Sequence, residues 1–144
     1  MNTIRSGTKK RIEEILQDYP NLEKYIRDRR KELMYPIQDD DENVGGGKSS
    51  KVSRPQEQMI ITIDEDLRLK ALEREKRAVE KVLLGSDSET YMIADRLYFH
   101  NSNNDSLDNL INKHEVLCGH TQAFQRRTKL INGIAKELGL YDPY

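Results

Sequence analysis

The 144-residue chain suits one small domain with an appended segment, because a typical domain takes about 100–150 residues. Hydrophobic residues make up 35% and charged residues 34%, a composition that favours long solvated helices or disordered segments. The single cysteine, Cys118, excludes an internal disulfide, and no apolar run is long enough for a membrane span or a signal peptide. We therefore expect a soluble cytoplasmic protein. A formal net charge of −1 leaves a nucleic-acid partner open, because a local basic surface is sufficient for binding.

Residues 1–35 carry two stretches of apolar side chains at helical spacing, one on each side of Pro20. Because proline removes a backbone hydrogen bond from a helix interior, the segment is either a helical hairpin or one kinked helix. We predict an N-terminal helical pair and assign residues 1–35 to a helical hairpin.

Residues 36–54 are rich in glycine, serine and acidic side chains and poor in apolar ones, which predicts a flexible linker. Within this segment, Gly47, Lys48 and Ser49 match the end of a phosphate-binding loop. That motif requires a glycine at position 42, which is Glu42 here, and the preceding acidic run 39–41 would repel phosphates. The linker interpretation is therefore favoured.

Residues 55–144 predict a C-terminal helical bundle. Apolar spacing indicates a long amphipathic helix over 55–84, although the sequence Ile-Ile-Thr-Ile at 60–63 is also compatible with a short strand. The apolar stripe of this helix fits either packing within the chain or a partner helix. Gly85 ends the helix, and residues 86–89 offer N-cap candidates for the next one, which reaches Tyr98.

A helix-turn-helix is predicted at about 106–138. Ser106 is placed to cap a short helix, Gly119 lies in a turn, and a last helix covers about 121–138. Two helices joined by a glycine-containing turn, with the second one basic, are typical of this DNA-binding motif.

The last predicted helix separates apolar and polar side chains. Its apolar face comprises Ala123, Phe124, Leu130, Ile131, Ile134 and Leu138. Arginine suits guanine, glutamine suits adenine and lysine suits phosphate, so the opposite face is suited to DNA. The candidate DNA-binding residues are Thr121, Gln122, Gln125, Arg126, Arg127 and Lys129. Segment 121–138 has a net charge of +3, although an ordinary solvated surface also has this pattern.

Three stretches, "DENVGGGKSSKVSRPQEQ", "LRLKALEREKRAVEKVL" and "TQAFQRRTKLINGIAKELGL", together resemble the RinA-like family of phage late-gene transcriptional activators. The resemblance covers about residues 36–140 and implies a C-terminal part similar to sigma-factor region 4. It also implies activation of late genes, with double-stranded DNA and host RNA polymerase as partners, in the bacterial cytoplasm and without a cofactor. The first motif helix departs from the family's threonine-tryptophan start. By periodicity Arg127 lies near the buried face, which suits clamping a neighbouring element or a phosphate.

Other interpretations have weaker support. His114, Cys118 and His120, with Glu115 nearby, carry zinc-binding groups but lack paired C-x2-C spacing, so we expect no metal. Cys118 has no catalytic signature around it and suits a buried position, and we do not expect an enzyme.

The alternative function is a phage protein-interaction module, such as an assembly or packaging factor. A homo-oligomer is compatible with either function.

Overall fold

The computed structural model describes residues 4–34, 63 and 66–140, and all regular structure in that part of the chain is helical. The helices are α1 (Ser6–Met34), α3 (Leu67–Leu84), α4 (Ser88–Ala94), the π-helical turn η1 (Asp95–Phe99), α5 (Leu107–Asn112) and α6 (His120–Glu137). The predicted all-α class is confirmed. The predicted linker at 36–54 lies outside the described residues, as does most of segment 55–65.

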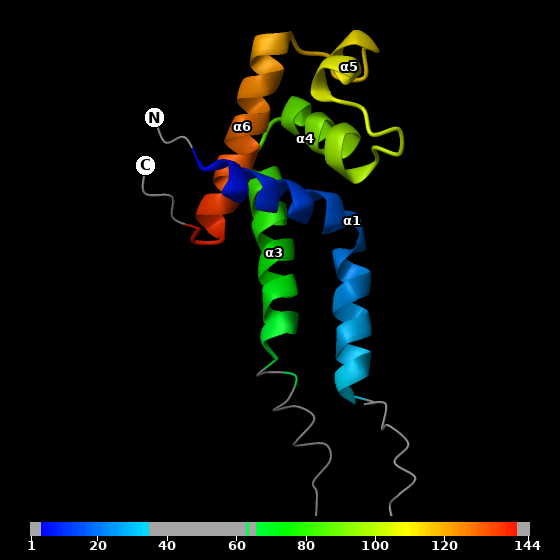
Figure 1. Ribbon diagram of the computed structural model, residues 1–144, viewed down its shortest axis with the longest axis vertical. Helices are drawn as coiled ribbons and strands as arrows, with labels where there is room; N and C mark the ends of the chain where they lie inside the picture. The colour runs from blue at the N-terminus through cyan, green and yellow to red at the C-terminus, as the bar shows by residue number, and fades with distance from the viewer. Residues whose placement is uncertain (1–3, 35–62, 64–65, 141–144) are drawn as a thin grey trace, which may run out of the picture.

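The N-terminal segment is one kinked helix, α1, with Pro20 in its interior. Figure 1 shows the axis of α1 changing direction partway along its length, so that its second part runs beside α3. Of the two arrangements that the sequence allowed, the hairpin is therefore absent. The helix continues through the proline because apolar side chains on both sides of it are buried; these are Ile12, Ile15, Leu16, Leu22 and Ile26.

Helix α3 begins later than the predicted helix over 55–84. Its N-cap is Asp66, whose backbone is extended (φ −69°, ψ 115°) and whose carboxylate accepts a hydrogen bond from the Leu69 N–H. A helix running unbroken from position 55 is therefore wrong at this point. An aspartate at an N-cap binds an otherwise unpaired backbone donor, and this local bond competes with helix continuation.

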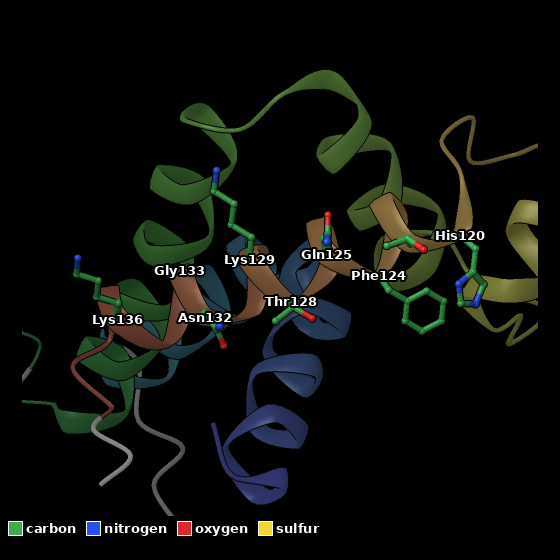
Figure 2. Close-up of a pocket in the computed structure, with 9 residues that line it drawn as sticks. His120, Phe124, Gln125, Thr128, Lys129, Asn132, Gly133 and Lys136 are labelled. Atoms are coloured by element: carbon green, nitrogen blue, oxygen red, sulfur yellow. The ribbon is translucent and has the colours of Figure 1, made fainter. Parts of the chain in front are cut away.

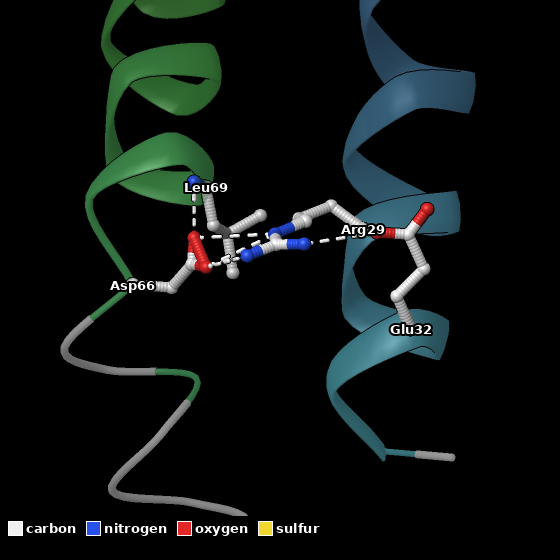
Figure 3. Close-up of polar contacts among 4 residues, drawn as sticks. All are labelled: Arg29, Glu32, Asp66 and Leu69. Atoms are coloured by element: carbon white, nitrogen blue, oxygen red, sulfur yellow. Dashed lines mark hydrogen bonds and ion pairs between the residues drawn. The ribbon is translucent and has the colours of Figure 1, made fainter. Parts of the chain in front are cut away.

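Arg29 of α1 fastens this cap to the N-terminal helix. Its Nη2 lies 2.6 Å from Asp66 Oδ2 and its Nε 3.0 Å from the same oxygen, while its Nη1 pairs with Glu32 at 2.9 Å (Figure 3). The Arg29 guanidinium and the Leu69 N–H together lower the pKa of Asp66. The ion pair between Arg29 and Asp66 thus joins α1 to the N-terminus of α3.

The larger core, called here the first cluster, lies where α1, α3, the α4–η1 segment and α6 meet. Its buried members are Ile12, Ile15, Leu16, Ala78, Val79, Ala94, Tyr98, Leu130, Ile131, Ile134 and Ala135. The N-terminal helix therefore shares a core with the C-terminal helices. The buried side chains of α3 pack within the chain, as one of the two interpretations of its apolar stripe expected.

A smaller core, the second cluster, joins α4, α5 and the start of α6. Its buried members are Ile93, Leu107, Leu110, Val116, Cys118 and Ala123. The predicted caps of the short helices are confirmed: Asp87 accepts from the Thr90 N–H at 2.8 Å, and Ser106 accepts from the Asn109 N–H at 3.2 Å. Cys118 is buried, as predicted.

Candidate nucleic-acid interface

The two helices of the predicted motif are present as α5 and α6, packed through the second cluster. The connection between them spans 113–119, longer than the three or four residues typical of a helix-turn-helix turn. His114 adopts a left-handed backbone conformation within it (φ 61°), and the N–H groups of Glu115 and Val116 both bond to the Leu110 carbonyl. The arrangement is thus two packed helices with an extended, internally bonded connection.

The outer side of α6 carries exposed polar side chains. Thr121, Gln122, Gln125 and Lys129 are all exposed, and within the described part of the chain none of their side chains has a hydrogen bond or ion pair. Figure 2 shows Gln125, Thr128 and Lys129 along this side of the helix, and the open surface they line runs on to Lys136. Three of the six predicted residues, Thr121, Gln125 and Lys129, therefore line one accessible surface.

A second groove adjoins this surface. It runs between α6 and the segment that joins α3 to α4, and its lining includes Gly85, Thr90 and Gln122. Gln125 and Lys129 border both this groove and the open surface. These two side chains are therefore the most centrally placed of the predicted set.

Arg126 has intramolecular partners. Its Nε lies 3.1 Å from Asp87 Oδ2 and its Nη2 lies 2.7 Å from Glu89 Oε2, so it ties α6 to the start of α4. Hydrogen bonds from Thr90, with a further bond from Arg126, lower the pKa of Asp87 to about 2. A guanidinium held by two carboxylates is not available to a guanine edge unless those pairs open. Helical periodicity gave no signal for this, because the partners lie on another helix.

Arg127 lies near the buried face, as its periodicity indicated. Its Cζ is 4.6 Å from the centre of the Phe124 ring, and its Nε is buried without a hydrogen-bond partner among the residues that the structure describes. Phe124 itself is only partly buried and stacks on His120, with ring centres 4.4 Å apart. Phe124, which the sequence places on the apolar face of the helix, therefore packs against the edge of the second cluster and is not one of its buried members.

The zinc-type residues of the connection have other environments. His120 Nε2 lies 2.9 Å from Asp108 Oδ1, a contact between α6 and α5, and Cys118 is in the second cluster. Among the residues with described positions, no three His, Cys, Asp or Glu side chains are grouped to hold a metal ion.

A second basic surface lies on α3 and was not identified from the sequence. Lys70, Arg74, Arg77 and Lys81 are all exposed. Their spacing of four, three and four residues places them on one side of a helix. This spacing was visible in the sequence but was obscured by the acidic residues interspersed with it.

The fold is thus an all-α assembly in which one long helix, α6, connects two cores and presents a polar outer side. The chain belongs to the family described as "Protein of unknown function (DUF722)", whose family model matches residues 8–136. The match begins within α1 and ends within α6. The comparisons with curated proteins and with solved structures found no match. Within the described ranges, no helix has the length and apolar character needed to cross a membrane.

Proposed function

We propose that this protein is a sequence-specific regulator of transcription that binds double-stranded DNA through the outer side of α6. One observation carries the proposal: Gln122, Gln125 and Lys129 are exposed and have no partner among the residues described, on a helix whose other side is anchored in two cores. Side chains that are free in the unbound protein make base contacts without first breaking internal bonds.

The chemistry of these side chains is suited to the major groove, which is about 12 Å wide and admits an α-helix. A glutamine amide pairs bidentately with adenine, and Lys129 is suited to a phosphate. Arg126 has a different role in this proposal, since its pairs with Asp87 and Glu89 hold α6 against α4 and so fix the orientation of the reading helix.

The finer assignment rests on the resemblance to RinA-like activators. It supports activation of phage late genes together with host RNA polymerase. On this basis the DNA site lies near a late promoter.

The test begins with purified protein mixed with fragmented phage genome, followed by sequencing of the retained fragments. Against a duplex found in this way, Gln125→Ala should cost about 1–3 kcal/mol of binding free energy and relax base selection at one position. Lys129→Ala should weaken binding to all duplexes similarly. Circular dichroism should show parental helicity in both variants, because both side chains are exposed.

If both variants remain folded and bind like the parent, α6 does not read DNA. A protein-interaction module would then be favoured, and exposed apolar side chains support that second candidate: Leu84 is 88% exposed, Leu117 77% and Tyr91 52%. Sedimentation of the parent and of Leu117→Ser would test it, since loss of a protein contact should shift the variant to a smaller species.

A further inference from the structure

The basic surface on α3, called here the α3 stripe and defined by Lys70, Arg74, Arg77 and Lys81, is separated from the acidic side chains of the same helix. Those acidic groups face α1: Glu73 pairs with Arg30 at 2.9 Å and Glu75 with Arg11 at 3.0 Å. Glu80 accepts a hydrogen bond from the Tyr19 hydroxyl at 3.0 Å. The acidic side chains of α3 thus bond to side chains of α1. The exposed side of α3 that carries the stripe is basic.

Few hydrogen-bond acceptors or acidic side chains in the described part of the chain pair with the α3 stripe. Arg74 donates to the Leu138 carbonyl at 3.1 Å, and Lys81 pairs with Glu137 at 3.2 Å. Lys70 and Arg77 have no side-chain hydrogen bond or ion pair with any residue whose position is described. In the described part of the chain, Glu137 is the single acidic side chain paired with the stripe.

We propose that the α3 stripe binds the phosphate backbone of the same DNA duplex whose bases α6 reads. This inference rests on the proposed function and adds a second contact surface to it. At about 1.5 Å of rise per residue the stripe is about 16 Å long. Duplex DNA carries about one negative charge per 1.7 Å of its axis, so this length faces a dense row of phosphates.

The position of the α3 stripe favours DNA over other polyanions. Lys81 lies one helical turn before Gly85, which borders the groove that Gln122 and Gln125 also line. Across the contact between α3 and α6, Lys136 adds a further exposed cation beside Glu137. Basic side chains therefore extend from α3 toward the side of α6 that carries the free glutamines.

The experiment compares two double variants of the full chain. Lys70→Ala with Arg77→Ala removes the two unpaired cations of the stripe, seven residues apart on one helix. Lys24→Ala with Lys31→Ala removes two exposed cations, also seven residues apart, from the side of α1 opposite its buried Leu22 and Ile26. Both double variants lose the same charge, so they differ in the position of that charge.

Binding of a labelled random-sequence duplex and of the retained genomic duplex is measured between about 50 and 200 mM salt. The stripe variant should weaken both duplexes alike and lower the slope of log K against log salt by roughly 2, since each lost phosphate contact removes about 0.9. The α1 variant should keep the parental slope. Circular dichroism and thermal melting confirm that both are folded.

Each other outcome is decisive. If the stripe variant keeps the parental slope while Gln125→Ala loses base selection, the stripe proposal falls and the proposed function stands. If the stripe variant weakens binding but the parent shows no base selection, the stripe stands and base reading by α6 falls. If the parent binds no duplex, both fail. Stripe-dependent binding to phosphatidylserine vesicles without duplex binding would assign the surface to a lipid and overturn the proposal.

Discussion

The two halves of α6 lie in different environments. The C-terminal half contributes Leu130, Ile131, Ile134 and Ala135 to the first cluster, beside helices that are distant in sequence. The N-terminal half contributes only Ala123 to the buried set of the second cluster, where it meets the short helices α4 and α5. One helix is thus firmly anchored at one end and lightly packed at the other.

This difference indicates where stability and binding reside. A six-residue helix such as α5 is not stable alone, so its structure depends on the second cluster and its caps. The lightly packed half of α6 has room for exposed polar side chains, and most of the predicted DNA contacts lie there. The first cluster supplies a rigid base from which that half projects.

The largest expected effect is loss of stability in the first cluster. Ile134→Ala removes a fully buried side chain from the contact of α6 with the rest of the first cluster and should lower the free energy of unfolding by about 2–5 kcal/mol. Urea denaturation followed by circular dichroism measures this. Since the first cluster joins α1, α3 and α6, the whole fold should lose stability together.

Leu110→Ala is the matched change in the second cluster, at an equally buried position. Here hydrogen exchange should rise first in α5 and in the 113–119 connection, with α1 and α3 still protected. Equal acceleration in all helices would show that the two clusters unfold as one unit, and the comparison between them would fail.

A smaller effect is expected from Phe124→Ala. A buried phenylalanine costs about 3–5 kcal/mol on truncation, but this ring is only partly buried, so we expect about 1–2 kcal/mol. The variant should also lose the contacts of the ring with His120 and Arg127. Thermal melting measures the loss. A value as large as that of Ile134→Ala would show that the ring belongs to the core.

The contrast between Phe124 and Ile134 illustrates how far the sequence could predict the fold. Local signals worked: the Asp87 and Ser106 caps, the burial of Cys118 and the approximate ends of α6 follow from side-chain type and spacing. The apolar stripe correctly placed Ile134 in the core, but it also included Phe124, which is only partly buried. Periodicity gives the direction in which a side chain points from the helix, and it does not give how fully neighbouring elements bury that side chain.

Features that depend on distant residues could not be predicted in this way. Pro20 is compatible with a turn or a kink, and the choice depends on α3, which covers both parts of α1. The same limit applies to the site, since Gln122, Gln125 and Lys129 are free but Arg126 is paired with Asp87, 39 residues away in sequence. No single-helix pattern contains that information.

The hydrogen bonds of Asp87 with Thr90, and the further bond with Arg126, predict a modest dependence of stability on acid. Because the pKa of Asp87 is about 2 when folded and 3.8 ordinarily, the unfolded chain binds the proton more readily between these values. Its stabilising contribution is therefore complete above about pH 4 and lost as pH falls through 2. The contribution should be small, since the side chain is half exposed and screened by water.

Asp87→Asn tests this contribution. The variant should be less stable at pH 6, and its stability should fall less than that of the parent between pH 4 and 2. Asp66 also has a lowered pKa and adds a slope of the same sign in both proteins, so the difference between the two curves isolates Asp87. Superimposable curves would show that the Asp87 carboxylate adds nothing to stability through its bonds with Thr90 and Arg126.

The smallest effect is expected at Gly133, where α6 crosses α3 in the firmly anchored half. Replacing glycine by alanine inside a helix gains about 0.8–1 kcal/mol of intrinsic propensity. Against this, a Cβ at position 133 would lie 3.2 Å from Val82 Cγ1, closer than ordinary contact, so the valine must shift by a few tenths of an ångström. We expect these terms nearly to cancel, with Gly133→Ala within about 0.5 kcal/mol of the parent by urea denaturation.

The double variant Gly133→Ala with Val82→Ala relieves the contact and should be more stable than Val82→Ala alone by about the full helix propensity. If Gly133→Ala alone shows that full gain, α3 and α6 separate without cost, and the first cluster is less rigid at this crossing than its burial indicates.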